Sequence, residues 1–323
     1  MPKIRVGILR GGPSSEYEVS LKTGAEILKH LPTDKYTPAD IFIDKQGVWH
    51  SIGLPISPAK VFEQTEVIFN ALHGEYGEDG QVQKVLEDFQ VPYTGSGRLA
   101  SALGVNKPLA GKYLHQAGLK VPPGLAFTWL DEPQIIAQTV FRKISPPWVI
   151  KPADRGSSVG IFFADNLSDL LSGIEQALEY SNQIMVEEYI KGVEATCGVV
   201  DDFRGLNYYP LLPIEIRRPV NSSVWSYEDK YSGLTEELCP GQFTGQLGEE
   251  LGRLAILAHQ TLGLRHYSRS DFIVSPTRGI YILEVNTLPG LTPTSLLPKS
   301  LEAIGCDYSD FLDHLVSLAL KRK

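Results

Sequence analysis

The chain has 323 residues, of which 42% are apolar and 21% are charged, which is the composition of an ordinary globular protein with a large core. A chain of this length more often forms two or three domains than one. The net charge of −8 and the pI near 5.5 argue against nucleic acid or an anionic membrane as the main partner.

Cysteine use and hydropathy indicate the compartment. The three cysteines are widely spaced and odd in number, so they predict neither a disulfide framework nor a zinc site. No segment approaches the roughly 20 apolar residues of a membrane span, and the apolar run of MPKIRVGIL is too short for a signal peptide. We therefore expect a cytoplasmic protein with no nucleic-acid or membrane partner.

Residues 1–97 alternate between strand and helix patterns. Strands are predicted at 4–8, 35–44 and 66–72, and apolar residues at helical spacing predict helices at 19–31 and 81–89. Such an order is typical of the α/β class, in which helices cover a mostly parallel sheet. Gly95-Ser-Gly97 marks a plausible boundary after this unit.

Residues 98–190 follow an α+β pattern instead. A helix is predicted at 107–117 and another at 170–178, and a third strand at 184–190. The strands at 148–151 and 160–164 are joined by a short Gly-Ser-rich loop, which favours an antiparallel hairpin.

The remaining residues predict strands at 195–200, 271–274 and 280–286. A long helix at 247–262 lies between them, and a closing helix follows at 308–316. Residues 204–245 have no strong periodicity after Ile216. A loop of that length in a compact domain is usually functional or disordered.

The stretch LEVNTLPG at 283–290 places the carboxylate Glu284 in an apolar run, with Asn286 on the same strand face. A buried carboxylate needs compensation. Together with Asp271, which opens a neighbouring strand, these residues offer three oxygen donors of the kind that Mg²⁺ prefers. The alternative is a salt bridge from Glu284 to a lysine or arginine.

Lys151 ends the strand WVIKP and is followed by DRGSSVG at 154–160. A lysine in an apolar run needs an anionic partner, and small residues let backbone N–H groups approach phosphate oxygens. The segment lacks the P-loop pattern, and a tight hairpin turn would have the same composition.

Other polar residues stand at predicted strand ends or in loops, and each has two interpretations. Glu16 either caps the following helix or receives a ligand cation, and HGEYGEDG at 73–80 is either a loop entering a helix or the wall of a substrate site. His73 alone is more often a structural hydrogen-bonding group than a catalyst. Arg269 shares a strand face with Asp271 and could stabilise developing negative charge, whereas Lys230-Tyr231 either closes over phosphate or is solvated.

Seven motifs taken together resemble the D-alanine–D-alanine ligase family of the ATP-grasp fold. In the family's order and approximate spacing they are GGPSSEYEVS, LHGEYGEDG, VIKPADRGSSVG, VEEYIKGVE, YEDKY, SRSDF and LEVNTLPGLTPTSL. The resemblance covers nearly the whole chain. It implies three domains: an N-terminal Rossmann-like substrate domain at 1–97, a central ATP-grasp lid domain at 98–190 and a C-terminal ATP-grasp catalytic domain at 191–323.

The resemblance also implies residue roles. The residues that bind ATP are expected to be Lys107, Lys151, Ser157, Glu187, Glu188, Ile190 and Glu194. Two Mg²⁺ ions, for which Mn²⁺ can substitute, are expected to bind to Asp271, Glu284 and Asn286. The substrate-binding residues are expected to be Glu16, His73, Ser295 and Leu296. The catalytic groups are expected to be Glu16, Ser157, Tyr231, Lys230, Arg269 and the backbone of Gly290. Asn106-Lys107-Pro108 departs from the usual Asp-Lys, and a later lysine is displaced to Lys112.

The function implied is ATP-dependent joining of two D-alanines through D-alanyl phosphate, for peptidoglycan precursor synthesis, by a cytoplasmic homodimer. The alternatives within the fold are another ATP-grasp carboxylate–amine ligase or a D-alanine–D-lactate ligase. A regulator that binds nucleotide without catalysis is disfavoured by the metal-ligand pattern and Arg269. A dinucleotide-dependent oxidoreductase lacks its glycine fingerprint.

Overall fold

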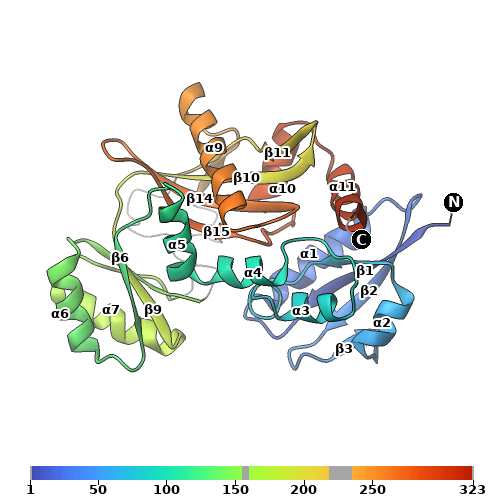
Figure 1. The fold of residues 1–323 in the computed structure, drawn as a ribbon, viewed down its shortest axis with the longest axis horizontal. Helices are drawn as coiled ribbons and strands as arrows, with labels where there is room; N and C mark the ends of the chain where they lie inside the picture. Colours follow the sequence, from blue (N-terminus) through green and yellow to red (C-terminus); the bar gives the residue numbers. More distant parts are fainter. Residues whose placement is uncertain (1, 155–159, 218–234, 322–323) are drawn as a thin grey trace.

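The computed structural model describes residues 2–154, 160–217 and 235–321, and in these ranges it contains three β-sheets (Figure 1). The first sheet lies within residues 4–70, the second within 124–188 and the third within 193–286. No helix in the described ranges is long and apolar enough to cross a membrane.

The first sheet is mostly parallel, as the strand and helix pattern predicted. Its central strand β1 (Ile4–Gly11) pairs in parallel with β2 (Tyr36–Ile43) and β5 (Val67–Asn70). The short strands β3 (Trp49–Ser51) and β4 (Leu54–Pro55) extend the β2 edge in antiparallel pairs. The associated helices are α1 (Tyr17–His30), α2 (Pro58–Gln64) and α3 (Gln81–Asp88). The loops after β1 and β5 therefore meet at the carboxyl edge of the sheet, where open α/β sheets bind ligands.

The second sheet has the strand order β6-β9-β7-β8, and all its pairs are antiparallel. Its strands are β6 (Gly124–Thr128), β7 (Trp148–Pro152), β8 (Phe162–Ala164) and β9 (Gln183–Glu188). Helices α6 (Pro133–Lys143) and α7 (Leu167–Tyr180) pack on the face that carries Trp148, Ile150 and Val186. Because side chains alternate along a strand, Lys151 and Glu187 project from the other face. The predicted β7–β8 hairpin is confirmed.

The third sheet is antiparallel, with the order β13-β12-β10-β14-β15 and β11 beside β10. Its short strands are β11 (Leu206–Pro210), β12 (Ile214–Arg217) and β13 (Glu236–Leu238). Its long strands are β10 (Val193–Phe203), β14 (Tyr267–Ser275) and β15 (Gly279–Asn286). Helices α4 (Arg98–Val105), α5 (Lys107–Gln116) and α9 (Gly245–Thr261) contribute to its core. Helix α10 (Leu296–Ala303) and helix α11 (Tyr308–Lys321) share a second core with β1 and β5, which joins the third sheet to the first.

The expectation of one loop over residues 204–245 is wrong in the described part of that range. Strands β11 (Leu206–Pro210), β12 (Ile214–Arg217) and β13 (Glu236–Leu238) occupy it. These strands are three to five residues long and owe their conformation to pairing with β10 and with one another. Such short segments carry no detectable period of their own. Residues 218–234 lie outside the described ranges.

The domain boundaries predicted at residues 97 and 190 stay a prediction. The three sheets fall in the three predicted segments in chain order. The side chains of α4 and α5 pack with α9 and β15 in the core of the third sheet, although residues 98–119 precede the second sheet in the chain.

Candidate active site

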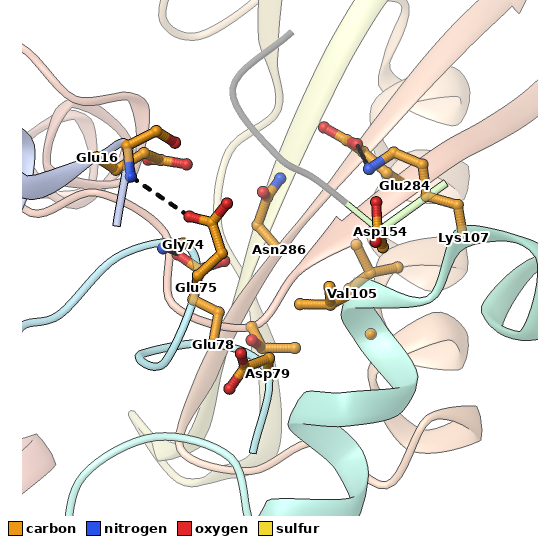
Figure 2. Close-up of a pocket in the computed structure, with 14 residues that line it drawn as sticks. Glu16, Gly74, Glu75, Glu78, Asp79, Val105, Lys107, Asp154, Glu284 and Asn286 are labelled. Carbon is orange, nitrogen blue, oxygen red and sulfur yellow. Dashed lines mark hydrogen bonds and ion pairs between the residues drawn. The ribbon is translucent and has the colours of Figure 1, made fainter. Parts of the chain in front are cut away.

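One pocket is lined by residues from all three sheet regions, and we call it the principal pocket because the predicted site residues Glu16, Lys107, Glu284 and Asn286 line it (Figure 2). The loop after β1 contributes Ser15 and Glu16, and the loop after β5 contributes Gly74, Glu75, Glu78 and Asp79. The opposite wall comes from the α4–α5 junction, from the loop after β7 and from the end of β15, with Gly104, Val105, Lys107, Asp154, Glu284, Val285, Asn286 and Thr287. Figure 2 shows Glu16 and Glu75 facing Lys107 and Glu284 across the pocket, with Asn286 between them.

Carboxylates dominate the charge of this pocket. The described lining includes Glu16, Glu75, Glu78, Asp79, Asp154 and Glu284, against the single ammonium group of Lys107. A concave site with this excess of negative charge attracts ammonium groups and metal cations, and it repels a free polyphosphate unless cations accompany it. HGEYGEDG thus leads into helix α3 and also lines this pocket with Gly74, Glu75, Glu78 and Asp79, and the wall that it forms is acidic.

Ser14 ties the two loops of the first sheet together. Its Oγ accepts a hydrogen bond from the Glu16 backbone N–H at 3.0 Å and donates one to Glu75 Oε2 at 3.0 Å. Gly74 has φ +67°, and a Cβ there would lie 2.4 Å from Ser14 Oγ. A side chain at position 74 would therefore break this contact, so the glycine is required by the approach of the two loops.

His73 lies behind the pocket wall and is 4% exposed. Its Nε2 lies 2.9 Å from Thr23 Oγ1 on α1, and its Nδ1 lies 3.4 Å from Glu78 Oε1. Burial lowers the pKa of His73, but the hydrogen bond and the negative charge of Glu78 outweigh it and leave the pKa raised. His73 therefore reaches the pocket through Glu78, and its predicted contact with substrate stays a prediction.

We expect Glu78→Gln to destabilise the protein in a pH-dependent way. A raised His73 pKa stabilises the fold below the unfolded-state value of about 6.5, and this contribution disappears as pH rises through the folded value. Because the neutral amide no longer favours imidazolium, the loss should be about 1–3 kcal/mol at pH 5.5 and much smaller at pH 9. Urea unfolding across pH measures it, with the exposed Glu63→Gln on α2 as control. A deficit that does not vary with pH would show that the charge of Glu78 does not act on His73.

Four of the predicted site residues share one face of the β14–β15 ladder. In the register of this pair, Arg269 lies opposite Asn286 and Asp271 lies opposite Glu284. Arg269 holds Asp271 with two hydrogen bonds, Nε to Oδ1 at 2.9 Å and Nη2 to Oδ2 at 2.8 Å. Asn286 Nδ2 donates to the same carboxylate at 3.1 Å, and so does the hydroxyl of Thr196 on β10. Asp271 is thus fixed by three neighbours.

Glu284 has the ion-pair partner that one interpretation of the sequence required. Lys107 Nζ, at the start of α5, lies 3.3 Å from Glu284 Oε2. The ion pair leaves lone pairs of Glu284 available to a metal ion, because a carboxylate has about four lone-pair sites. The two carboxylates and the Asn286 amide are the hard oxygen donors that Mg²⁺ takes, so the donor set fits this ion once Asp271, which accepts four hydrogen bonds, exchanges part of them for the metal. In the described ranges no three His, Cys, Asp or Glu side chains converge on one point, so substrate oxygens or water must complete the coordination.

Lys151 and Glu187 form a buried pair on the free face of the second sheet. Lys151 Nζ lies 2.6 Å from Glu187 Oε2, and each side chain is 8% exposed. Beside Glu187, a cavity of about 450 Å³ opens between α5 and the ends of β6, β9 and β15. Its lining also includes Met185, Lys107 and Glu284, so it adjoins the principal pocket. Lys107 therefore lines the cleft between the second and third sheets, and Lys151 lies beside this cleft through its pair with Glu187.

The remaining predicted nucleotide contacts lie at the exit of β9. Glu188 is held by Arg278, which belongs to the turn between β14 and β15. Ile190 is buried against Ile273 and Tyr281 of that hairpin. Glu194 is buried near the start of β10. The structure thus gathers these residues along the junction of the second and third sheets.

The predicted sites for the second substrate lie after β15. Ser295 precedes α10, and its Oγ lies 2.8 Å from Thr292 Oγ1 and accepts a hydrogen bond from the Thr292 backbone N–H. A Cβ on Gly290 would lie 2.7 Å from Ser295 Oγ, so these two residues are adjacent. Leu296 packs against Ile214 and Ile216 of β12. Ser157, Lys230 and Tyr231, which were predicted to act in catalysis, lie outside the described residues.

Sequence reasoning missed several residues of the site. Asp154 and Thr287 line the principal pocket, and Thr196 holds Asp271. Asp154 and Thr287 each stand within a quoted motif, VIKPADRGSSVG and LEVNTLPG, so proximity to a motif was the available signal. Thr196 had only the weaker signal of a hydroxyl in the apolar run of β10.

The three sheets and the cleft between the second and third define the ATP-grasp class of proteins. Family models agree with this assignment. The D-ala D-ala ligase C-terminus model matches residues 113–317, and the D-ala D-ala ligase N-terminus model matches residues 5–56 and 52–96. The chain belongs to the D-alanine–D-alanine ligase family, which confirms the resemblance found in the sequence.

Individual relatives cover almost the whole chain. The D-alanine–D-alanine ligase of Geotalea uraniireducens is 37% identical over 316 residues, which are 98% of this chain and 95% of the relative. That of Desulfotalea psychrophila is 38% identical over 325 residues, or 99% and 96%. These ligase names over the full length confirm the class of enzyme that was predicted.

Solved structures show the same fold. The Bacillus anthracis D-alanine–D-alanine ligase complexed with ATP has a TM-score of 0.83 and 30% identity, with 98% of each chain covered. The VanG D-Ala:D-Ser ligase of Enterococcus faecalis has a TM-score of 0.86 and 26% identity, with 98% of this chain and 100% of that chain covered. The predicted ATP-grasp fold is thereby confirmed.

Proposed function

We propose that the protein joins two D-alanines to D-alanyl-D-alanine at the expense of ATP, as a step in the synthesis of peptidoglycan precursors. The observation that carries the proposal is one pocket with two different walls. One wall bears carboxylates suited to an amino acid's ammonium group, and the other bears Lys107, Glu284 and Asn286. Arg269 and Asp271 lie opposite Asn286 and Glu284 on the β14–β15 ladder behind that wall, and Lys151 pairs with Glu187 at the adjoining cavity. This combination serves carboxylate activation by ATP.

The first half of the reaction activates a poor electrophile. Glu16 receives the ammonium of the first D-alanine and so aims its carboxylate across the pocket. That carboxylate attacks the γ-phosphorus of ATP, the bond to the β-phosphate oxygen breaks, and D-alanyl phosphate and ADP form. Lys107 and Lys151 offset the charge on the transferred group.

The second half forms the amide bond. The neutral amine of the second D-alanine attacks the acyl carbon, the C–N bond forms and the C–O bond to phosphate breaks, and the amine releases a proton. Burial lowers the pKa of Arg269, but the charge and hydrogen bonds of Asp271 raise it by more, so the net pKa is raised. The guanidinium therefore remains cationic beside the developing oxyanion. The Gly290 backbone donates to the same oxyanion, and Ser295 and Leu296 receive the carboxylate of the second substrate.

The proposal extends to the metal, the remaining residues and the assembly. Asp271, Glu284 and Asn286 hold two Mg²⁺ ions, or Mn²⁺ in their place, and the ions supply positive charge to the phosphate oxygens when bound. Glu187, Glu188 and Ile190 form the segment that contacts the nucleoside, Glu188 through its backbone, and Glu194 contacts the ribose. Ser157, Lys230 and Tyr231 act at the substrate side. The protein works as a homodimer of three-domain subunits in the cytoplasm.

The test is ADP release with D-alanine, L-alanine and D-lactate supplied separately, and with D-alanine mixed with D-lactate or D-serine. D-serine is included because VanG, which shares the fold, is a D-Ala:D-Ser ligase. We expect ADP release that requires both Mg²⁺ and D-alanine, and D-alanyl-D-alanine as the main product by mass spectrometry. Equal release with L-alanine, or none with D-alanine, would contradict the proposal. A mixed product that outweighs the dipeptide would assign the second substrate differently.

A further inference from the structure

The turn between β14 and β15 contacts the end of β9 through a two-pronged ion pair. Arg278 Nη1 and Nη2 donate to Glu188 Oε1 and Oε2, the second at 3.0 Å. The guanidinium carbon of Arg278 lies 5.3 Å from the centre of the Tyr281 ring, and Lys120 Nζ donates to the Arg278 carbonyl at 2.8 Å. Arg278 is therefore held from two sides in a geometry that matches a carboxylate fork.

The chain that leaves β9 is fastened to the same hairpin by two further contacts. Ile190 is buried with Ile273 and Tyr281. Gly192 passes so close to β14 that a Cβ would lie 2.4 Å from the Val274 carbonyl oxygen. The Arg278–Glu188 pair is thus the polar member of a set of contacts that fixes residues 188–192 on the β14–β15 hairpin.

Glu187 and Glu188 have different tasks, because neighbours on a strand project to opposite faces. Glu187 turns toward the cleft, where it pairs with Lys151 and lines the cavity of about 450 Å³. Glu188 pairs with Arg278 instead. The charge of Glu188 can therefore affect a ligand of the cleft through the position of the backbone, without contact between its carboxylate and that ligand.

We propose that Arg278 is a positioning residue for ATP: through Glu188 it fixes the exit of β9, the segment that borders the nucleotide cleft. The inference rests on the proposed function for the identity of the nucleotide. An exposed pair contributes little to global stability, and here Arg278 is 43% and Glu188 19% exposed in their side chains. Its effect should therefore appear in nucleotide affinity rather than in folding.

The test uses a charge swap with a matched control. Arg278→Glu places two carboxylates together and should raise KM for ATP and Kd for ADP about fivefold, which corresponds to about 1 kcal/mol. KM for D-alanine should stay the same, and kcat should fall less than twofold. The double variant Arg278→Glu with Glu188→Arg should return KM for ATP to within twofold of the natural protein. Arg278→Lys keeps the charge but loses the fork, so it should lie between the two.

Arg253→Glu is the control, because Arg253 makes an equally two-pronged pair with Glu250 on the exposed side of α9. It should leave KM for ATP unchanged. The inference is overturned if Arg278→Glu behaves like Arg253→Glu, if the double swap does not restore affinity, or if KM rises equally for ATP and D-alanine. Thermal unfolding of every variant shows whether a variant is unfolded under the assay conditions. If Arg278→Glu is unfolded, KM for ATP of Arg278→Lys tests the inference in its place.

Calorimetry with ADP separates this inference from the proposed function. If the natural protein binds ADP but forms no D-alanyl-D-alanine, the proposed reaction fails while the role of Arg278 is still measured. If the natural protein does not bind ADP, both fail.

Discussion

Replacement of Lys151 with methionine should both destabilise the protein and slow ligation. Lys151 Nζ lies 2.6 Å from Glu187 Oε2, and both side chains are 8% exposed. The substitution leaves a carboxylate buried without its cation, a change that typically costs about 3–5 kcal/mol. It also removes a charge proposed to face phosphate, which should lower the rate about 10²–10³-fold.

A double variant separates these two effects. The double variant Lys151→Met with Glu187→Leu removes both charges of this pair. Replacing a buried pair by apolar residues is often neutral or stabilising. We expect guanidinium unfolding to show recovered stability, while the rate of dipeptide formation stays low. Lys84→Met removes an exposed lysine that pairs with Asp88 on α3, so this control should change stability by less than about 1 kcal/mol. Recovery of ligation in the double variant would mean that Lys151 serves only the fold.

The long periodic elements could be predicted from the sequence because each carries its own signal. Strand β1 and helix α1 repeat apolar residues with the periods of a strand and a helix, and α9 does so over 17 residues. Strand β13 gave no such signal, because its conformation comes from pairing with β12. Local pattern cannot reveal a partner that lies elsewhere in the chain.

The same distinction applies to the site. That Glu284 and Asn286 share a face follows from their spacing on one strand, and so does the relation of Arg269 to Asp271. The register that places Asp271 opposite Glu284 includes an irregularity after Asp271, which spacing does not reveal. Pairs such as Lys107–Glu284 and Arg278–Glu188 join residues far apart in the chain, so only the fold shows them.

Glu284→Gln tests which partner of this carboxylate matters for the reaction. The amide keeps the shape but removes one negative charge from the proposed metal site. Loss of one electrostatic contact in the transition state costs about 3–4 kcal/mol, so the rate at saturating ATP and D-alanine should fall about 10²–10³-fold. The Mg²⁺ concentration needed for half-maximal rate should rise, because the donor set has lost a charge. Glu250→Gln, a carboxylate on the exposed side of α9, should change neither quantity.

Lys107→Gln and the double variant complete a cycle that identifies the cause. Lys107 Nζ lies 3.3 Å from Glu284 Oε2, so Glu284 could act on the reaction only by holding this lysine. In that case the double variant would be no slower than the slower single variant, and the Mg²⁺ requirement would not change. If Glu284 holds metal while Lys107 meets phosphate, each substitution removes a different contact, and the double variant should be slower than either single variant. We expect the second result, with a raised Mg²⁺ requirement in Glu284→Gln and in the double variant but not in Lys107→Gln. Full turnover of Glu284→Gln at high Mg²⁺ would instead leave Glu284 as an ion-pair partner only.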